Sequence, residues 1–273
     1  IQHKNNDARM PIEPPELIAL LAPRPVYVDS ALEHRRAVAR GEFQGKPSEQ
    51  FLTTVHPGNR RLLAVGLGPA DRLTPDRWRR AAAAGVIAAR ARKFDTVAVA
   101  APGAGPDDVA AAVDGAVTAG FEVSTYRTAE RESASLRHVE VLLASSTRAM
   151  DDAVRRGLVL GDAVNTARAL ANEPGNVLSP RVLGERAAAL AADAGLGVDV
   201  LDEAALDELG MHLLLGVGRG SAEPPRLIVL RYEPDDLPPS PTIALVGKGV
   251  TFDTGGISIK PSEKMELMKY DMA

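Results

Sequence analysis

Four residues suited to a metal-dependent hydrolytic site lie close together near the end of this sequence of 273 residues. They are Lys248, Asp253, Lys260 and Asp271, in a stretch that also contains four glycines. Carboxylate oxygens bind hard divalent cations, and a cationic nitrogen can stabilise the oxyanion that develops when a carbonyl is attacked. The combination therefore predicts a metal site with hydrolytic chemistry.

The elements around these residues should bring them to one place. A strand predicted over residues 242–246 would end just before Lys248, and open α/β sheets bind ligands at the carboxyl ends of their strands. Asp253 follows after a short loop, and Gly255 and Gly256 allow the chain to turn away sharply. Asp253 is therefore the strongest candidate for a metal ligand.

The two lysines are expected to differ in protonation state. Lys248 can bind a metal only as the neutral amine, so we expect it to be buried beside the ion. Lys260 would remain an ammonium group that faces a developing oxyanion. Asp271 would supply another oxygen after residues 262–270 bring the chain back over the site.

Taken singly, each residue also has an ordinary explanation. Lys248 could be a solvated turn residue, Asp253 could bond backbone amides, and Lys260 could be exposed. Their combination with the strand end and the glycines favours a site, because sites are judged by joint geometry. The nearby methionines are expected to line the core or a pocket and not to bind metal through sulfur. They are Met265, Met268 and Met272.

Composition excludes several classes of protein. The chain has 36 acidic and 32 basic residues, a formal net charge of −4 and no basic run, which argues against nucleic acid as a partner. It has no cysteine, so any metal must use oxygen and nitrogen ligands. The absence of cysteine, of a signal-like start and of a long apolar run predicts a soluble cytoplasmic protein with no membrane partner.

Apolar runs alternate with alanine-rich helical stretches, which is typical of an α/β protein with a mainly parallel sheet. In the first half we predict strands over residues 61–66, 96–101, 121–125 and 139–144, and helices over 74–92 and 106–119. The first helix should begin at Thr74 and Pro75, which are an N-cap residue and a proline suited to the first helical position. A small N-terminal α/β domain is therefore expected over residues 1–145.

A long helix over residues 146–171 should link this domain to a second one. Helix-breaking residues follow it at 172–176 and include Pro174 and Gly175. The second domain, residues 173–273, should contain helices over 180–194 and 202–209 and strands over 197–200, 226–232 and 242–246. It reads as an α/β unit that is cut short.

The motif that carries the predicted chemistry resembles the leucyl aminopeptidase family of dinuclear cytosol aminopeptidases. The likeness rests on residues 246–261, Val-Gly-Lys-Gly-Val-Thr-Phe-Asp-Thr-Gly-Gly-Ile-Ser-Ile-Lys-Pro, followed by Met-Lys-Tyr-Asp-Met at 268–272. Thr254 stands where family members usually have serine. The likeness extends through residues 220–230 and 172–178, and residues 61–68 are similar to a strand of the family's N-terminal domain; it is weak before residue 60.

The resemblance implies roles for the four residues. Lys248 and Asp271 would bind one metal, Asp253 would bridge two, and Lys260 would be the catalytic lysine. It further implies removal of the first residue from peptides with a free N-terminus, two divalent ions (manganese, zinc or magnesium) and a homo-hexamer. The N-terminal domain would resemble a macro domain, and residues after the linker helix would be the first part of the catalytic domain.

One family segment, Asn-Thr-Asp-Ala-Glu-Gly-Arg, has no counterpart in these 273 residues. The nearest string, at residues 165–168, lacks the acids. We therefore expect the chain to be part of a longer aminopeptidase and to be inactive by itself.

The alternative is a binding or regulatory protein on the same scaffold, with DNA or a nucleotide as its ligand. The acidic balance argues against DNA, and the glycines at 66–68 fit a tight turn better than a nucleotide loop. The intact set of two acids and two lysines favours the enzyme.

Overall fold

The computed structural model describes most of the chain as two compact units. The described residues are 2–5, 17–22, 39–55, 60–101, 103–123, 126, 136–143, 147–234 and 241–272. Unit 1 is Ile1–Thr166 and unit 2 is Ala167–Ala273, so the division falls within the predicted linker helix. No helix in the described part of the chain is both long and apolar enough to cross a bilayer.

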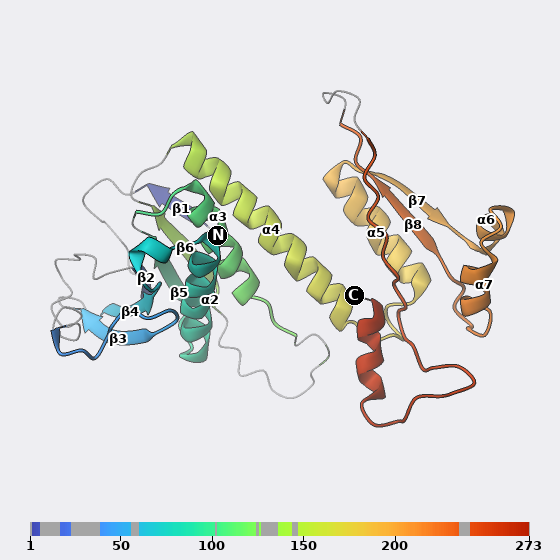
Figure 1. Ribbon diagram of the computed structural model, residues 1–273, viewed down its shortest axis with the longest axis horizontal. Helices are drawn as coiled ribbons and strands as arrows, with labels where there is room; N and C mark the ends of the chain where they lie inside the picture. Colours follow the sequence, from blue (N-terminus) through green and yellow to red (C-terminus); the bar gives the residue numbers. More distant parts are fainter. Residues whose placement is uncertain are drawn as a thin grey trace. The chain divides into compact units, whose positions relative to one another are not determined.

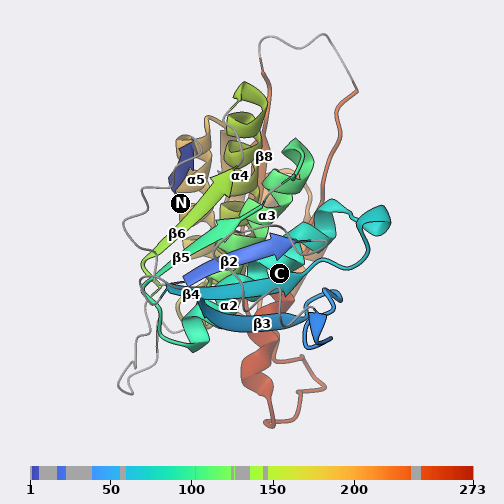
Figure 2. The same cartoon turned by 90° about the vertical axis from the view of Figure 1, so that its left-hand side faces the viewer.

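Unit 1 is built on a six-stranded sheet in the order β1-β6-β5-β2-β4-β3. The strands are β1 (Gln2–Asn5), β2 (Leu17–Ala22), β3 (Gln50–Val55), β4 (Arg60–Gly66), β5 (Thr96–Ala100) and β6 (His138–Leu143). Every neighbouring pair is parallel except β3 and β4. The strands are seen side by side in Figure 2. The predicted mainly parallel α/β architecture is confirmed.

Two helices connect the parallel strands of unit 1. They are α2 (Pro75–Ala91) after β4 and α3 (Pro106–Ala119) after β5, and both have proline in the first turn. Proline suits this position because its fixed φ matches a helix and its missing N–H would be unpaired there anyway. Thr74 precedes α2 with extended backbone, as predicted, although its side chain makes no capping hydrogen bond. A short 3-10 turn, η1 (Ala70–Arg72), lies between β4 and α2.

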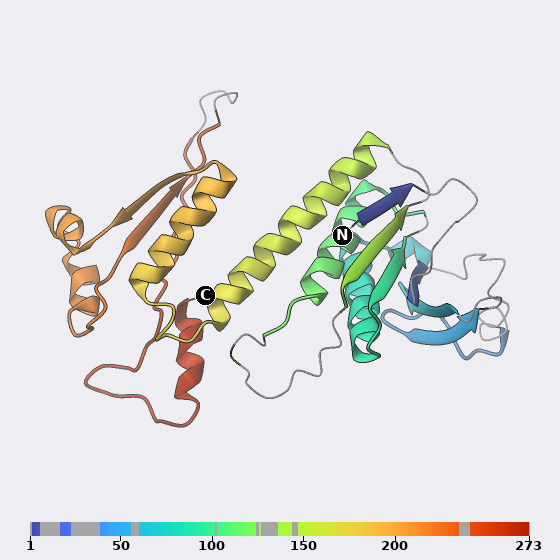
Figure 3. The same cartoon turned by 180° about the vertical axis from the view of Figure 1, so that it is seen from behind.

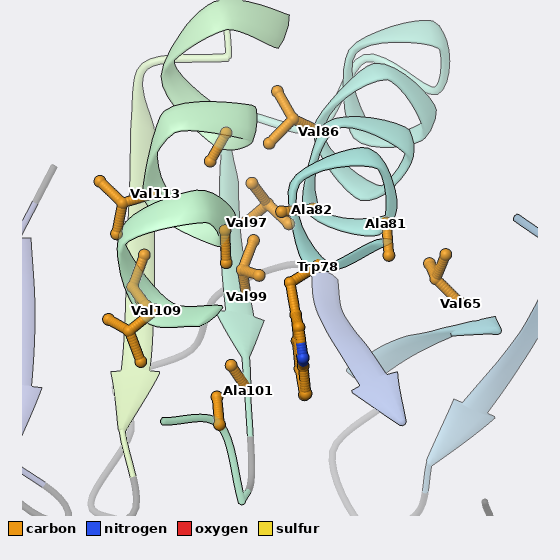
Figure 4. Close-up of a cluster of buried hydrophobic side chains, with 14 of the residues drawn as sticks. Val65, Trp78, Ala81, Ala82, Val86, Val97, Val99, Ala101, Val109 and Val113 are labelled. Carbon is orange, nitrogen blue, oxygen red and sulfur yellow. The ribbon is translucent and has the colours of Figure 1, made fainter. Parts of the chain in front are cut away.

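The core of unit 1 lies between these helices and the sheet. Trp78 is 2% exposed and packs among small and β-branched side chains, including Val97 and Val99 of β5 and Val109 of α3. Figure 4 shows Trp78 beside Val99 and Ala101. Burying a side chain of this kind contributes about 1.5–3 kcal/mol or more. Trp78 is therefore the packing residue that fixes α2 on the sheet.

Helix α4 (Arg148–Asn172) follows β6, and its first part packs on α3. A Cβ atom at Gly157 would lie 2.4 Å from the backbone oxygen of Ala110, so only glycine permits this approach. Arg156 forms an ion pair with Asp107 at 2.5 Å, and the Asn165 amide donates to the Val117 carbonyl at 3.0 Å. The long predicted helix is confirmed.

Unit 2 pairs one helix with a two-stranded antiparallel ribbon. Its elements are α5 (Pro180–Ala194), β7 (Gly197–Leu201), α6 (Glu203–Glu208), α7 (His212–Gly218), β8 (Leu227–Arg231) and the 3-10 helix η2 (Met265–Met272). Figures 1 and 3 show α5 along β7 and β8. A Cβ atom at Gly184 of α5 would lie 2.8 Å from Val200 of β7, which explains the glycine there.

Two predicted strands are wrong. Residues 242–246 have no strand structure, and Ile243, Leu245 and Val246 are 85%, 95% and 95% exposed. No described strand pairs with them, and a strand forms only where its N–H and C=O groups find partners. Residues 121–123 also form no strand, and Arg90 there contacts the Phe121 carbonyl and the Glu122 carboxylate; residues 124–125 lie outside the described part.

Candidate metal centre

A tight turn places Asp253 at the centre of the predicted site. The Gly255 amide donates to Asp253 Oδ1 at 2.9 Å, which is a side-chain-capped turn of the kind aspartate commonly forms. Gly255 has a φ of 96°, and a Cβ atom there would lie 2.4 Å from the Ser258 oxygen. Glycine is therefore required at this position by both backbone conformation and space.

The same turn returns Lys260 to Asp253. Gly255 and Ile259 form an isolated antiparallel bridge, and the Lys260 amide donates to the Thr254 carbonyl at 2.9 Å. The Lys260 ammonium then lies 3.0 Å from Asp253 Oδ2. Lys260 and Asp253 are thus adjacent in space because the chain between them closes a small loop.

The η2 helix brings Asp271 to the same ammonium. Lys260 Nζ lies 3.5 Å from Asp271 Oδ2, and the Met268 sulfur accepts a hydrogen bond from it at 3.1 Å. The Val250 amide donates to the Asp271 carbonyl oxygen at 3.2 Å, which ties η2 to the loop before Asp253. Three of the four predicted residues therefore meet at one nitrogen.

The electrostatics of this cluster follow from these contacts. The hydrogen bond from the Gly255 amide, and after it the Lys260 ammonium, lowers the pKa of Asp253 below its ordinary value. The Asp253 carboxylate is the main cause that raises the pKa of Lys260. Asp253 is therefore a carboxylate and Lys260 an ammonium at neutral pH. This is the protonation state predicted for Lys260.

Lys248 differs from its prediction. It is exposed and makes no hydrogen bond or ion pair within the described part of the chain, although its charge contributes to the lowered pKa of Asp253. The predicted burial and its position at the end of a strand are both wrong, because residues 242–246 form no strand. The other three residues converge without that strand.

The carboxylates suit a divalent cation. Asp253 Oδ2 and Asp271 Oδ2 both lie within 3.5 Å of one cationic nitrogen. The Oδ2 of Asp271 is buried, and its contact with the Lys260 ammonium at 3.5 Å is too long for a well-formed hydrogen bond. Across the described residues, no three His, Cys, Asp or Glu side chains gather as a metal site.

Sequence reasoning missed two contributors to this cluster. Met268 is predicted only to line the core or a pocket, and its sulfur also accepts a hydrogen bond from Lys260. Asn172 was counted only among the helix-breaking residues, yet it contacts both Lys269 and Tyr270 of η2. The spacing of Met268 one turn before Asp271 was a usable signal, whereas nothing in the sequence linked Asn172 to residues nearly a hundred positions later.

Two family models match this chain. The catalytic domain of the cytosol aminopeptidase family matches residues 165–273, and the N-terminal domain of the same family matches residues 19–130. The matched ranges contain all four predicted site residues and most of unit 1. The chain belongs to the cytosol aminopeptidase family.

Individual relatives agree with this assignment. A Solibacter usitatus protein named "Probable cytosol aminopeptidase" is 44% identical over 239 residues, which is 86% of this chain and 49% of that protein. A relative with the same name from Acidobacterium capsulatum is 40% identical over 261 residues, 93% of this chain and 51% of its own length. The chain spans about half the length of the curated relatives it matches.

A solved structure described as the bottromycin maturation enzyme BotP in complex with Mn is also similar. It is 37% identical, has a TM-score of 0.78 and is matched over 95% of this chain and 53% of that one. Tomato leucine aminopeptidase, at 22% identity and a TM-score of 0.76, shares the fold.

Proposed function

We propose that this chain provides the N-terminal domain and the first part of the metal centre of an aminopeptidase that removes the first residue from peptides. The single observation that carries the proposal is the meeting of Asp253, Asp271 and Lys260 at one point. Family membership and the likeness to BotP, whose structure was solved with Mn, support it.

In this proposal Asp253, Asp271 and Lys248 hold two divalent cations. Carboxylate oxygens and an amine nitrogen suit manganese, zinc or magnesium, and bound ions of this kind polarise a carbonyl and activate water. Lys248 would have to move from its exposed position to reach the carboxylates. Such a movement is open to a long side chain flanked by Gly247 and Gly249.

Lys260 would act on the substrate. Its ammonium is held beside Asp253 by a turn that glycine alone permits, so it is fixed at the metal site before substrate arrives. A fixed cation at the scissile carbonyl stabilises the oxyanion that forms during attack. The raised pKa of Lys260 keeps this proton in place across neutral pH.

The proposal extends to the assembled protein. Its substrates would be peptides with a free N-terminus, its location the cytoplasm and its assembly a homo-hexamer. No Asn-Thr-Asp-Ala-Glu-Gly-Arg segment occurs in the 273 residues, so we expect them to give no turnover of leucine 4-nitroanilide with manganese. Clear turnover would contradict this part of the proposal.

Manganese binding by the 273-residue chain tests the site itself. Calorimetric titration should show binding that Asp253→Asn weakens by about 100-fold or more, since a ligand oxygen is lost from the set. Asp193→Asn, an exposed acid on α5, is the matched control and should bind like the unaltered chain. Equal affinity for all three proteins would instead support a scaffold without catalysis.

A further inference from the structure

Asn172, the last residue of helix α4, contacts η2. The Lys269 ammonium donates to the Asn172 backbone oxygen at 2.8 Å, and the Tyr270 hydroxyl donates to Asn172 Oδ1 at 3.0 Å. The Asn172 side-chain amide donates to the Arg168 carbonyl at 2.8 Å. The side chain is thus held at both ends, by its own helix and by η2.

The position of Asn172 at the C-terminus of α4 explains why a lysine binds its backbone oxygen. The last carbonyls of a helix have no partner within it and carry the negative end of the helix dipole. A lysine ammonium is therefore favoured there. Lys269 also lies 5.1 Å from the centre of the Tyr270 ring, within the range of a cation–π contact. Lys269 and Tyr270 are consequently fixed as a pair.

This pair immediately precedes Asp271. Fixing Tyr270 on α4 limits where the next residue can lie, and the Asp271 carbonyl accepts from Val250 at 3.2 Å. The loop that follows Val250 packs against the turn after α4. A Cβ atom at Gly175 of that turn would lie 2.7 Å from the Cβ atom of Phe252. Asn172 at the end of α4 therefore supports η2, and Gly175 in the turn after α4 supports the loop that carries Asp253.

We propose that Asn172 is a positioning residue for the metal centre, which holds Asp271 in place opposite Asp253. This inference rests on the proposed function, because it assigns Asn172 to the same site. Among the described residues, the hydrogen bonds of the Asn172 side chain and backbone oxygen go to Arg168, Lys269 and Tyr270 and not to either carboxylate. Asn172 acts through Tyr270 and Lys269.

Two substitutions remove the side-chain contact from opposite ends. Asn172→Ala removes the acceptor and keeps the backbone oxygen for Lys269, while Tyr270→Phe removes the hydroxyl and keeps the ring. Asn176→Ala is the matched control, since Asn176 lies in the same turn, is exposed and has no hydrogen bond to a described residue. All are made in the full 273-residue chain.

Amide hydrogen exchange of the metal-free protein gives the first readout. In Asn172→Ala and Tyr270→Phe, exchange of the Val250 amide should rise severalfold because its acceptor, the Asp271 carbonyl, is released. Exchange at Leu183 and Leu196, which mark the two ends of α5, should not change. Unchanged exchange at Val250 in both variants overturns the inference.

Manganese affinity gives the second readout. Each variant should bind manganese about tenfold more weakly, as is typical when a residue that orients a ligand is lost. The double variant should be no weaker than Asn172→Ala, because both changes remove one contact. Full affinity in both single variants, or additive losses in the double variant, refutes the positioning role.

The two proposals fail in different ways. If the unaltered chain binds no manganese, the proposed function fails, and the exchange of Val250 still decides whether Asn172 holds Asp271. If the unaltered chain binds manganese and the variants bind it equally well, the function stands and the inference fails.

Discussion

At the scale of single residues, the ammonium of Lys260 occupies the space between two carboxylates. Its contacts with Asp253 and Asp271 leave both side chains about a third exposed, so solvent screens the interaction. The arrangement orients the three groups more than it stabilises the fold. A divalent cation that binds the two carboxylates has to displace this ammonium or share them with it.

The Lys260–Asp253 pair should depend on pH at both ends of the scale. The pKa of Lys260 is raised in the folded chain. Its contribution to folding stability is therefore complete below about pH 10.4 and is lost as pH rises through the raised pKa. The pKa of Asp253 is lowered in the folded chain. Its contribution to folding stability is therefore complete above about pH 3.9 and is lost as pH falls through the lowered pKa. The pair therefore persists across neutral pH.

The measurement is a titration of the lysine side chains by NMR. Asp253→Asn should bring the pKa of Lys260 back toward its ordinary value, and Asp193→Asn should leave it raised. A Lys260 that titrates alike in the two variants and in the unaltered chain would mean that the ion pair does not form in solution.

The site residues show which features the sequence could reveal. Asp253 and Lys260 converge as predicted because glycine at 255 fixes a turn that is readable from local sequence, and Asp271 joins them because η2 carries it back. The predicted burial of Lys248 is wrong, because the exposure of this residue depends on what surrounds residues 242–246, which local sequence does not reveal. Asn172 required the pairing of segments nearly a hundred residues apart.

At the scale of elements, all five predicted helices are observed, whereas two of the seven predicted strands, at 121–125 and 242–246, do not form among the described residues. Helix α3 occupies the predicted residues, and α5 begins after Ser179, whose hydroxyl accepts from the Val182 amide at 3.5 Å. Such signals act within one turn of helix. A strand has no such local support, and residues 242–246 remain unpaired despite their apolar side chains. Helix α7 was not predicted, and two of its seven residues are glycines, which have low helix propensity.

Close packing of α2 and α3 predicts a strong effect at one glycine. A Cβ atom at Gly115 would lie 2.0 Å from the backbone oxygen of Arg79, so Gly115→Ala must push the helices apart. Overpacking costs about 1–3 kcal/mol, and a clash with rigid backbone places this change at about 2–3 kcal/mol, whereas alanine gains about 1 kcal/mol in helix propensity. We expect a net loss of stability of about 1–2 kcal/mol in unit 1.

Urea unfolding followed by the fluorescence of Trp78 measures this change, because Trp78 is the only tryptophan and is buried on α2. The control is Gly216→Ala in α7, where a Cβ atom meets nothing within 4 Å. It should leave the Trp78 transition unchanged. A Gly115→Ala chain as stable as the parent would show that α2 and α3 are not packed so closely.

At the scale of the whole molecule, the two units differ in how completely they bury their apolar residues. Among the described residues, seven of the nine largest fully buried side chains, Trp78 and Leu63 among them, belong to unit 1, and two, Leu178 and Leu206, belong to unit 2. Unit 2 exposes apolar side chains along residues 243–246 and again at Ile257 and Ile259. Contiguous exposed apolar surface marks a place where other polypeptide binds. The relatives this chain matches are about twice its length, and their remaining residues are candidates for such a role.

This surface predicts that the 273-residue chain associates with itself through residues 243–246. An extended segment with unpaired backbone groups and apolar side chains is a template for another strand. Leu245→Lys should therefore lower the concentration-dependent rise in mass measured by sedimentation equilibrium, because a charge at the paired edge opposes association. Ile87→Lys is the matched control: Ile87 is 56% exposed on α2 of unit 1, and its replacement should leave association unchanged. A chain that stays monomeric at all concentrations would contradict the predicted self-association. An equal effect of Ile87→Lys and Leu245→Lys would show that residues 243–246 are not the surface through which the chain associates.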